Sequence, residues 1–477
     1  MIESRSGVWW TDDDPSVRVP GTLARAGERW QLDLIGTLRV NQQWEDQLSL
    51  VPPATIYGAC SGKRYTLRDS YLSHTNGPSI HIPGPRDQSD QADDQFSQTW
   101  FGFSLLDGDA LSEDTIYSRA SFELSGLSEW WPFSALQGSD APTDIVGYRP
   151  PEPTVAECDN GMTVTITALG SGGHGRRSHS LTERVVVAVE REAGFTLEEL
   201  LEQAVIPLQA LLAIIFDRRV EYFNLRLRPH PDANSEYSSH AALLPISFDP
   251  DVIESKHEKD AIREFPFFTA KDVQASEFIA KWISTSSRSV VPVSVAAPTS
   301  QAGSFQIQVV EAVNAAESLH RELHAEPSSS GFAEKVREAL KVAGGLNSEE
   351  RRKVVSAVKM TEVTLEARLL QLAQELGEEF CAWFFDGQVK DWAAIAATVR
   401  NALSHGYQTK HRIEHDPGAL SGVLQITLAV IRLRLLTEAG LPQDHALIEL
   451  LSKDPRYRAL MRQSVADWGA LRATMGS

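Results

Sequence analysis

The spacing of apolar residues differs between the first part of the chain and its last third. In the N-terminal 150 residues, apolar and polar positions alternate over short segments that are separated by Gly, Asn, Asp and Ser. Trp30, Leu32 and Leu34 form one such alternating segment, and Ser61-Gly62 suits a hairpin turn. This pattern is typical of half-buried β-strands joined by turns, so residues 1–150 are expected to form a β-rich lobe.

A second N-terminal lobe is expected at residues 151–288, after a proline-rich segment near residue 150. Residues 183–190 and 221–227 have strand patterns, and an apolar helix is expected between them at 196–217. The combination of strands and a helix predicts an α+β arrangement.

From about residue 305 onward, apolar residues recur every three or four positions, which is the period of amphipathic helices. Residues 305–477 are therefore predicted to form an all-α bundle, with residues 289–304 as the connection into it. The chain as a whole is expected to be multidomain, with a β-rich/α+β N-terminal region followed by helices. The expected helices cover residues 307–324, 332–342, 361–385, 391–405, 417–439, 444–452 and 454–472, and Asn347 is expected to cap a further one.

The charge of the chain is unevenly distributed. The 477 residues carry a net charge of −19, of which residues 305–477 contribute only −2 and the remainder −17. A nonspecific nucleic-acid binder would carry a broad positive surface. If this chain acts on RNA, it is expected to recognise one RNA shape at a small site, or to be kept from RNA until it is triggered.

Cysteine usage and hydropathy suggest a cytoplasmic protein. Cys60, Cys158 and Cys381 are widely separated, which indicates neither a disulfide framework nor a metal site. The N-terminus has no apolar signal segment, and the most hydrophobic window, residues 204–216, is too short to span a bilayer. No membrane association, metal or cofactor is expected.

The segment with the most chemical information is Arg400-Asn401-Ala402-Leu403-Ser404-His405, followed by Gly406. Apolar residues at helical spacing place one side of this helix in the core, which leaves Asn401 and His405 on the opposite face and Arg400 and Ser404 on the flank. An arginine can bind a phosphate through its fixed fork of donors, and a histidine can move a proton near neutral pH. The same residues could instead only complement the negative end of the helix dipole before a Gly cap.

Several other patterns are better explained by structure than by chemistry. Arg68 and His74 have similar spacing but lie in an expected strand, and the pairs Trp9-Trp10 and Trp130-Trp131 are expected mainly in core packing rather than base stacking. His320 and His324 lack the glutamate that a zinc-protease helix requires.

The chain resembles the ApeA-like family along nearly its whole length. The resemblance to an ApeA-like HEPN domain is carried by residues 316–321, 399–406 and 433–441, and that to an ApeA N-terminal domain by residues 7–10, 19–23, 32–36, 56–58 and 65–67. It implies an anti-phage, abortive-infection protein whose HEPN domain is a toxic endoribonuclease and acts as a homodimer. The N-terminal region would be a sensor or regulator, with a phage-derived trigger as its expected partner. The RNA substrate would be a tRNA or another structured RNA.

A metal-independent mechanism follows from RNA chemistry, because the ribose 2′-hydroxyl is an internal nucleophile. His405 is expected to act as general base or acid, Arg400 to stabilise phosphoryl charge, and Asn401 to position the phosphate or the imidazole. Supporting roles are expected for Glu317, Arg321, Ser404 and Tyr407.

Two alternatives remain open. The helical domain could be a HEPN-type module that binds RNA or a partner without catalysis, or a toxin whose motif loop is modified by a partner, for example at Tyr407. The acidic N-terminal part is expected to restrain the effector, so residues 305–477 alone are expected to be more toxic than the full chain.

Overall fold

The computed structural model covers the whole chain and describes the placement of most of its residues. The described ranges are 4–12, 14–26, 29–38, 54–76, 97–102, 104–107, 114–137, 147–174, 179–230, 244–245, 266–298, 304–324, 329–343, 345–359, 363–406, 408–409, 412–455, 457–459 and 471. The chain forms two compact units. One comprises Met1–Leu124, Val186–Glu202 and Tyr222–Ile262, and the other Ser125–Val185, Gln203–Glu221 and Arg263–Ser477.

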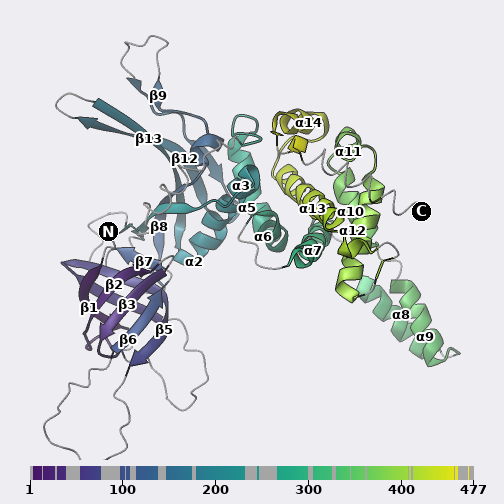
Figure 1. Cartoon of the computed structure of the whole chain (residues 1–477), viewed down its shortest axis with the longest axis horizontal. Coiled ribbons are helices and arrows are strands. Elements are labelled where there is room, and N and C mark those ends of the chain that lie inside the picture. Colours follow the sequence, from purple (N-terminus) through teal and green to yellow (C-terminus); the bar gives the residue numbers. More distant parts are fainter. Residues whose placement is uncertain are drawn as a thin grey trace, which may run out of the picture. The chain divides into compact units, whose positions relative to one another are not determined.

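The first unit contains a closed β-barrel. Its strands are β1 (Arg5–Thr11), β2 (Val19–Ala26), β3 (Arg29–Ile35), β4 (Ala54–Cys60), β5 (Lys63–Asn76), β6 (Ser97–Gly102) and β7 (Ser104–Asp107). They pair in the order β4-β1-β2-β3-β6-β5-β7, and a further antiparallel pairing of β4 with β5 closes the first six into a barrel (Figure 1). The expected β-rich character of this region is confirmed.

Alternation along the strands fills the barrel. On β3, Trp30, Leu32 and Leu34 are buried while the residues between them are more exposed. The expected turn at Ser61-Gly62 joins β4 to β5, and both residues have positive φ, 51° and 82°. Such left-handed turns match the twist of a two-residue hairpin.

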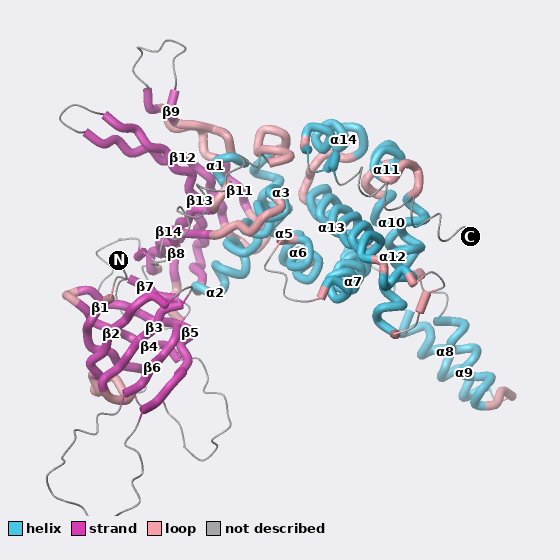
Figure 2. Tube along the Cα trace, in the orientation of Figure 1, coloured by secondary structure: helices cyan, strands magenta, loops and turns pink. Residues whose placement is uncertain are grey.

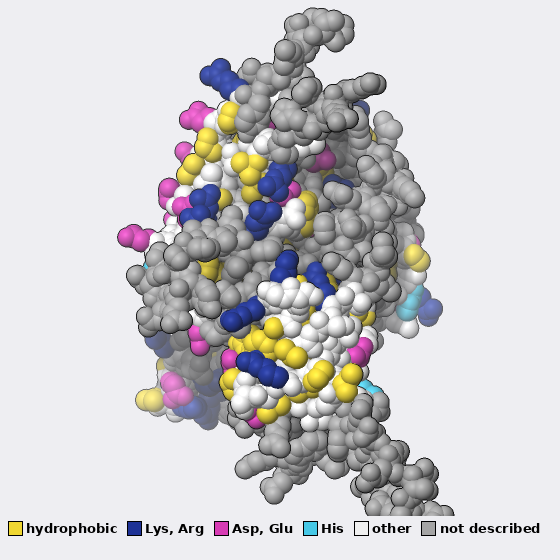
Figure 3. Space-filling view, turned by 90° about the vertical axis from the view of Figure 1, so that its left-hand side faces the viewer, with side chains coloured by type: hydrophobic (Ala, Val, Ile, Leu, Met, Phe, Trp, Pro, Cys, Tyr) yellow, Lys and Arg dark blue, Asp and Glu magenta, His cyan; other side chains and the backbone are white. Residues whose placement is uncertain are grey.

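The paired tryptophans are mostly core residues, as expected. Trp9, Trp130 and Trp131 are at most 1% exposed. Trp10 is half-buried, and the Arg18 guanidinium lies 3.5 Å from the centroid of its ring. On the face drawn in Figure 3, Lys and Arg side chains are interspersed with hydrophobic ones.

A second, six-stranded sheet has the order β11-β12-β13-β8-β14-β15. These strands are β8 (Tyr117–Leu124), β11 (Thr154–Glu157), β12 (Thr163–His174), β13 (His179–Phe195), β14 (Tyr222–Pro229) and β15 (Leu244–Pro245), and the short elements α1 (Leu127–Trp130), β9 (Leu136–Gln137) and β10 (Gly147–Tyr148) lie between β8 and β11 in sequence. Between β13 and β14 the chain forms α2 (Leu197–Leu200), the π-helical turn η1 (Leu201–Val205) and α3 (Ile206–Phe216). Thr196 and Glu199 form a capping box at the start of α2. The expected strand–helix–strand segment is thus present.

The described elements after the second sheet are helical (Figure 2). They are α5 (Ala275–Arg288), α6 (Val290–Ala296), α7 (Phe305–Leu323), α8 (Ser329–Ala343), α9 (Ser348–Lys359), α10 (Leu365–Gln374), α11 (Glu378–Phe384), α12 (Val389–His405), the 3-10 turn η2 (Ile413–His415), α13 (Pro417–Glu438) and α14 (Asp444–Lys453). The prediction of an all-α C-terminal region is confirmed, including Asn347, whose side-chain oxygen accepts from the backbone N–H of Glu349 and Glu350 at the start of α9.

Two sequence-based expectations about this region were wrong in detail. The single helix expected at 361–385 is two helices, α10 and α11, because Gly377 adopts a φ of +117° and a Cβ there would lie 2.5 Å from Asp444 Oδ1. Residues 289–304, expected as a plain connection, contain α6, which packs against α7 and α13.

Helix α13 lies at the centre of this bundle and contacts α5, α6, α7, α10 and α12. By length and composition, Leu197–Phe216 and Pro417–Glu438 could each cross a membrane. However, 67% and 89% of their apolar 18-residue windows are buried inside the structure, as in a core helix.

Candidate functional site

Helix α12 presents the Arg-Asn-x-x-x-His segment in its last two turns. The expected apolar stripe is present, since Trp392, Ile395, Ala396 and Val399 are at most 2% exposed. The helix ends at His405 and is capped by Gly406, which has a φ of +67° and donates its N–H to the carbonyl of Ala402 at 2.9 Å. This left-handed glycine cap makes the histidine the last residue of the helix.

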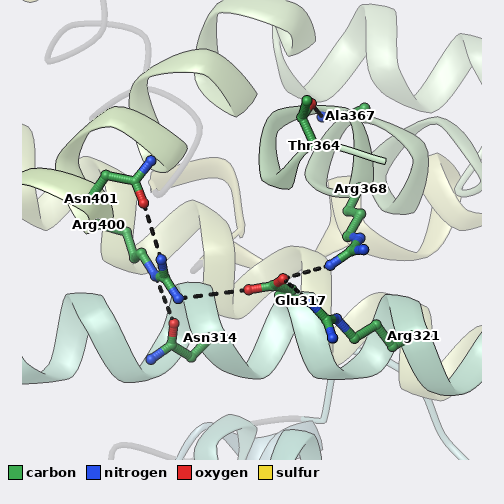
Figure 4. A network of polar contacts seen from close by, with 8 residues as sticks. All are labelled: Asn314, Glu317, Arg321, Thr364, Ala367, Arg368, Arg400 and Asn401. Carbon is green, nitrogen blue, oxygen red and sulfur yellow. Dashed lines mark hydrogen bonds and ion pairs between the residues drawn. The ribbon is translucent and has the colours of Figure 1, made fainter. Parts of the chain in front are cut away.

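The side chain of Arg400 turns towards α7 and is 25% exposed. Its Nε donates to Asn314 Oδ1 at 2.9 Å and its Nη1 to Asn401 Oδ1 at 3.0 Å, and its Nη2 lies 3.8 Å from Glu317 Oε2 (Figure 4). Two side-chain amides and one carboxylate therefore fix the plane of the guanidinium.

Glu317 is the centre of a larger network that joins three helices. Its carboxylate contacts Arg321 on α7 at 2.7 Å, Arg368 on α10 at 2.6 Å and Arg400 on α12 at 3.8 Å (Figure 4). The exposed fraction is 3% for Arg368, 57% for Arg321 and 18% for Glu317 itself. One carboxylate among three guanidinium groups leaves a local excess of positive charge.

Arg400 keeps donors for a further anion. A guanidinium has five N–H groups, and among the described residues two of those of Arg400 make hydrogen bonds, since 3.8 Å to Glu317 is an ion-pair distance. Because a guanidinium only donates, Asn314 and Asn401 must turn their oxygens to it and their NH₂ groups away. Three N–H groups and two amides are thus available to bind phosphate oxygens.

The remaining motif residues lie at the end of α12. Ser404 and His405 are exposed and Asn401 is half-buried. Five residues on a helix correspond to about 140° of rotation and about 7.5 Å along the axis. Arg400 and His405 therefore leave different sides of α12, while Asn401 shares the face of His405 and contacts Arg400. Tyr407 lies outside the described residues.

Thr409, which follows α12, is held by a buried carboxylate. Glu414 is 6% exposed and accepts from Thr409 Oγ1 at 2.5 Å. Burial acts to raise the pKa of Glu414, but the hydrogen bonds from Thr409 and the nearby His415 outweigh it, so the pKa lies below its usual value. The ionised side chain links Thr409 to the turn η2, which precedes α13.

The structure brings together expected residues and adds two that the sequence pattern did not reveal. Glu317 and Arg321, both expected as supporting residues, are in the network with Arg400. Asn314 and Arg368 were missed, although Asn314 lies three residues before Glu317 and hence on the same face of α7.

Other candidate patterns fall elsewhere. Arg68 and His74 are on strand β5, as expected. His320 is 1% exposed and its Nε2 lies 3.0 Å from Gln371 Oε1, while His324 Nε2 lies 3.0 Å from Glu375. Within the described ranges, no cluster of three or more His, Cys, Asp or Glu side chains is placed to hold a metal ion.

Comparison with protein families identifies the class of protein. The family described as ApeA N-terminal domain 1 matches residues 4–282, and the one described as Apea-like HEPN matches residues 310–445, which include the whole Glu317 network and the motif of α12. The first match alone spans more than half of the chain, so the protein belongs to the ApeA-like family, and it is an anti-phage protein of the HEPN family. No curated protein and no solved structure matches the chain.

Proposed function

We propose that this protein is a metal-independent endoribonuclease that cleaves RNA through its own ribose 2′-hydroxyl. The observation that carries the proposal is that Arg400 is held by Asn314, Asn401 and Glu317 and yet keeps three N–H donors that make no hydrogen bond to a described residue. A prepositioned cation with open donors suits the charge that develops on a phosphate during transfer. The HEPN family match supports a nuclease role.

In the proposed reaction, the 2′-oxygen attacks the adjacent phosphorus and the bond to the 5′-oxygen breaks. One imidazole removes the 2′-hydroxyl proton and another group protonates the leaving oxygen, so the products are a 2′,3′-cyclic phosphate and a 5′-hydroxyl. His405 handles one of these protons, Arg400 binds the non-bridging oxygens, and Asn401 lies between them.

A second copy of the chain would complete the site. Arg400 and His405 diverge around α12, and one imidazole cannot be base and acid at the same moment. We therefore infer a homodimer through the HEPN helices in which the two α12 ends face each other and supply two imidazoles. Sedimentation of the purified protein would show a dimer, and a strict monomer that cleaves RNA would contradict this arrangement.

The chemistry can be tested on purified full-length protein. Cleavage of a folded RNA is expected to continue in excess EDTA, because no step uses a metal, and to stop when the ribose at the cut carries no 2′-hydroxyl. Mass spectrometry of the fragments should find the 2′,3′-cyclic phosphate. Activity abolished by EDTA and restored by a divalent ion would favour a metal nuclease, and RNA binding without cleavage would favour the non-catalytic module.

The N-terminal region is proposed to restrain the effector until a phage-derived trigger binds it. A fragment that begins at residue 305 lacks α5 and α6, so the surfaces of α7 and α13 that these two helices cover would be exposed to solvent. A better fragment begins at residue 114, after the barrel. It keeps the second sheet, including β8, and removes residues 1–113, which carry 9 Lys+Arg and 16 Asp+Glu.

Residues 114–477 are expected to be more toxic on expression than the full chain, because deletion removes negative charge that disfavours nonspecific approach of RNA. Growth curves at matched expression would measure the difference. The added toxicity should vanish with Arg400→Ala. A folded but harmless fragment would show that the barrel activates the effector rather than restrains it.

A further inference from the structure

The hairpin of α8 and α9 stands out from the rest of the helical region. It is inserted between α7 and α10 and extends away from the bundle (Figure 1). Among the described residues, α8 and α9 pack extensively only on each other. Most of their described side chains are exposed, Val342 to 87%. Packing in the core of the bundle therefore does not explain why the chain contains this helix pair.

The hairpin is basic within an acidic protein. Residues 329–359 contain seven Lys and Arg and four Glu, a net of +3, whereas the whole chain carries −19. Lys341 pairs with Glu338 at 2.6 Å and Lys353 with Glu349 at 3.1 Å. The exposed side chains of Lys335 and Arg352 make no ion pair with a described residue.

The base of the hairpin adjoins the Glu317 network. Arg321 lies in the last turn of α7, directly before the hairpin, and Arg368 lies in the first turn of α10, directly after it. Both contact Glu317, which also contacts Arg400 (Figure 4). Arg321, whose side chain is 57% exposed, is thus linked to Arg400 through Glu317 and precedes the basic hairpin by eight residues in the sequence.

We propose that the α8–α9 hairpin is an arm that binds the phosphate backbone of RNA and extends the binding surface beyond Arg400. The identity of this RNA as substrate rests on the proposed function. A 15-residue helix is about 22 Å long, so the arm contacts phosphates well away from the cut. The substrate is therefore a folded RNA large enough to reach both, and a short oligonucleotide bound at Arg400 does not reach the arm.

The composition of the arm favours RNA over a second copy of this chain. Homodimer interfaces are largely apolar at their centre and depleted of charged residues. The described arm residues exposed to solvent are mainly Lys, Arg and Glu, with Val342 and Val354 as the large apolar exceptions. Lys and Arg with few apolar neighbours match a phosphate backbone better.

The test uses full-length protein with His405→Ala, so that RNA is not cut. Binding of bulk tRNA is measured between 50 and 200 mM salt for this parent, for Lys335→Glu/Arg352→Glu, and for the control Lys390→Glu/Lys453→Glu. All four residues are exposed, and both double variants change the net charge by the same amount. A Lys335→Gln/Arg352→Gln variant removes the same two charges without adding negative ones. Its melting temperature is compared with that of the parent to show that the protein is folded.

The arm variants are expected to weaken tRNA binding about tenfold at 100 mM salt and to reduce the salt slope by about 0.9 for each phosphate that the arm no longer neutralises, while the control changes neither. Binding of hexauridine should be equal in all variants. Equal tRNA binding by the arm variants and the control overturns the proposal, as does an arm variant whose dimer dissociates while its RNA binding is intact. If RNA binding depends on the arm but the wild-type protein never cleaves RNA, the proposal for the arm is supported and only the proposed ribonuclease activity is contradicted.

Discussion

Replacing His405 with alanine is expected to lower RNA cleavage by about 10²- to 10⁴-fold, the range that general acid–base groups contribute. His405 is the imidazole of the motif, and it is exposed at the end of α12, where the Gly406 cap fixes the last turn. Its loss removes a proton-transfer group without removing a core residue. Single-turnover cleavage of a labelled folded RNA, with enzyme in excess, would measure the effect.

A second exposed histidine provides a control that separates an effect on catalysis from an effect on stability. His445 on α14 is 73% exposed and pairs with Glu379 and Glu449, so His445→Ala is a suitable control. Exposed substitutions usually change stability by no more than about 0.5 kcal/mol, so both variants should melt alike. Near-normal cleavage by His405→Ala would remove the histidine from the mechanism.

The architecture predicted best from sequence is the one set by local periodicity. The apolar stripe and the glycine cap of α12 were visible in the sequence, and the helix lies within two residues of its expected start. The break at Gly377 was not visible, because an isolated glycine is tolerated within a helical pattern. It depends on Asp444, 67 positions later, which accepts from the backbone N–H of Phe380 and occupies the space that a side chain at 377 would need.

Closure of the barrel and assembly of the site depend on long-range pairing. Individual strands could be recognised by alternation, but the pairing of β1 with β4 that helps to close the barrel joins segments about 50 residues apart. The partner of Arg400 on α7, Asn314, lies 86 residues before it. Periodicity places each residue on a helix face but does not say which faces meet.

The domain boundaries expected from the sequence remain a prediction, because periodicity and composition do not show which distant segments pack together. The second compact unit joins Ser125–Val185 and Gln203–Glu221 to the helices that follow. Arg432 of α13 donates to the carbonyl of Ala296 and pairs with Asp217 at 2.7 Å. Composition shifts near residues 150 and 300 carry no information about such contacts.

Replacing Arg400 with lysine is expected to lower cleavage by about 10²- to 10³-fold, the loss typical for one donor to a developing oxyanion. Lysine keeps the charge but has no planar fork, so it cannot contact Asn314, Asn401 and a phosphate together. Because the interaction strengthens as charge builds on the phosphate, kcat should fall more than KM rises. Steady-state kinetics on the folded RNA would measure both, with Arg288→Lys on the exposed end of α5 as the control.

Asn314→Ala tests whether catalysis depends on the orientation of the Arg400 guanidinium as well as on its charge. This change removes the acceptor of Nε and leaves Glu317 and Asn401 in place. A positioning residue of this kind is expected to reduce kcat about tenfold, less than Arg400→Lys does, because the guanidinium remains but samples more orientations. In the Arg400→Lys background the same substitution should have almost no further effect, since there is no Nε left to hold. If instead the two reductions in kcat multiply, Asn314 acts on the RNA directly, and the arrangement of Arg400 by α7 is not what sets the rate.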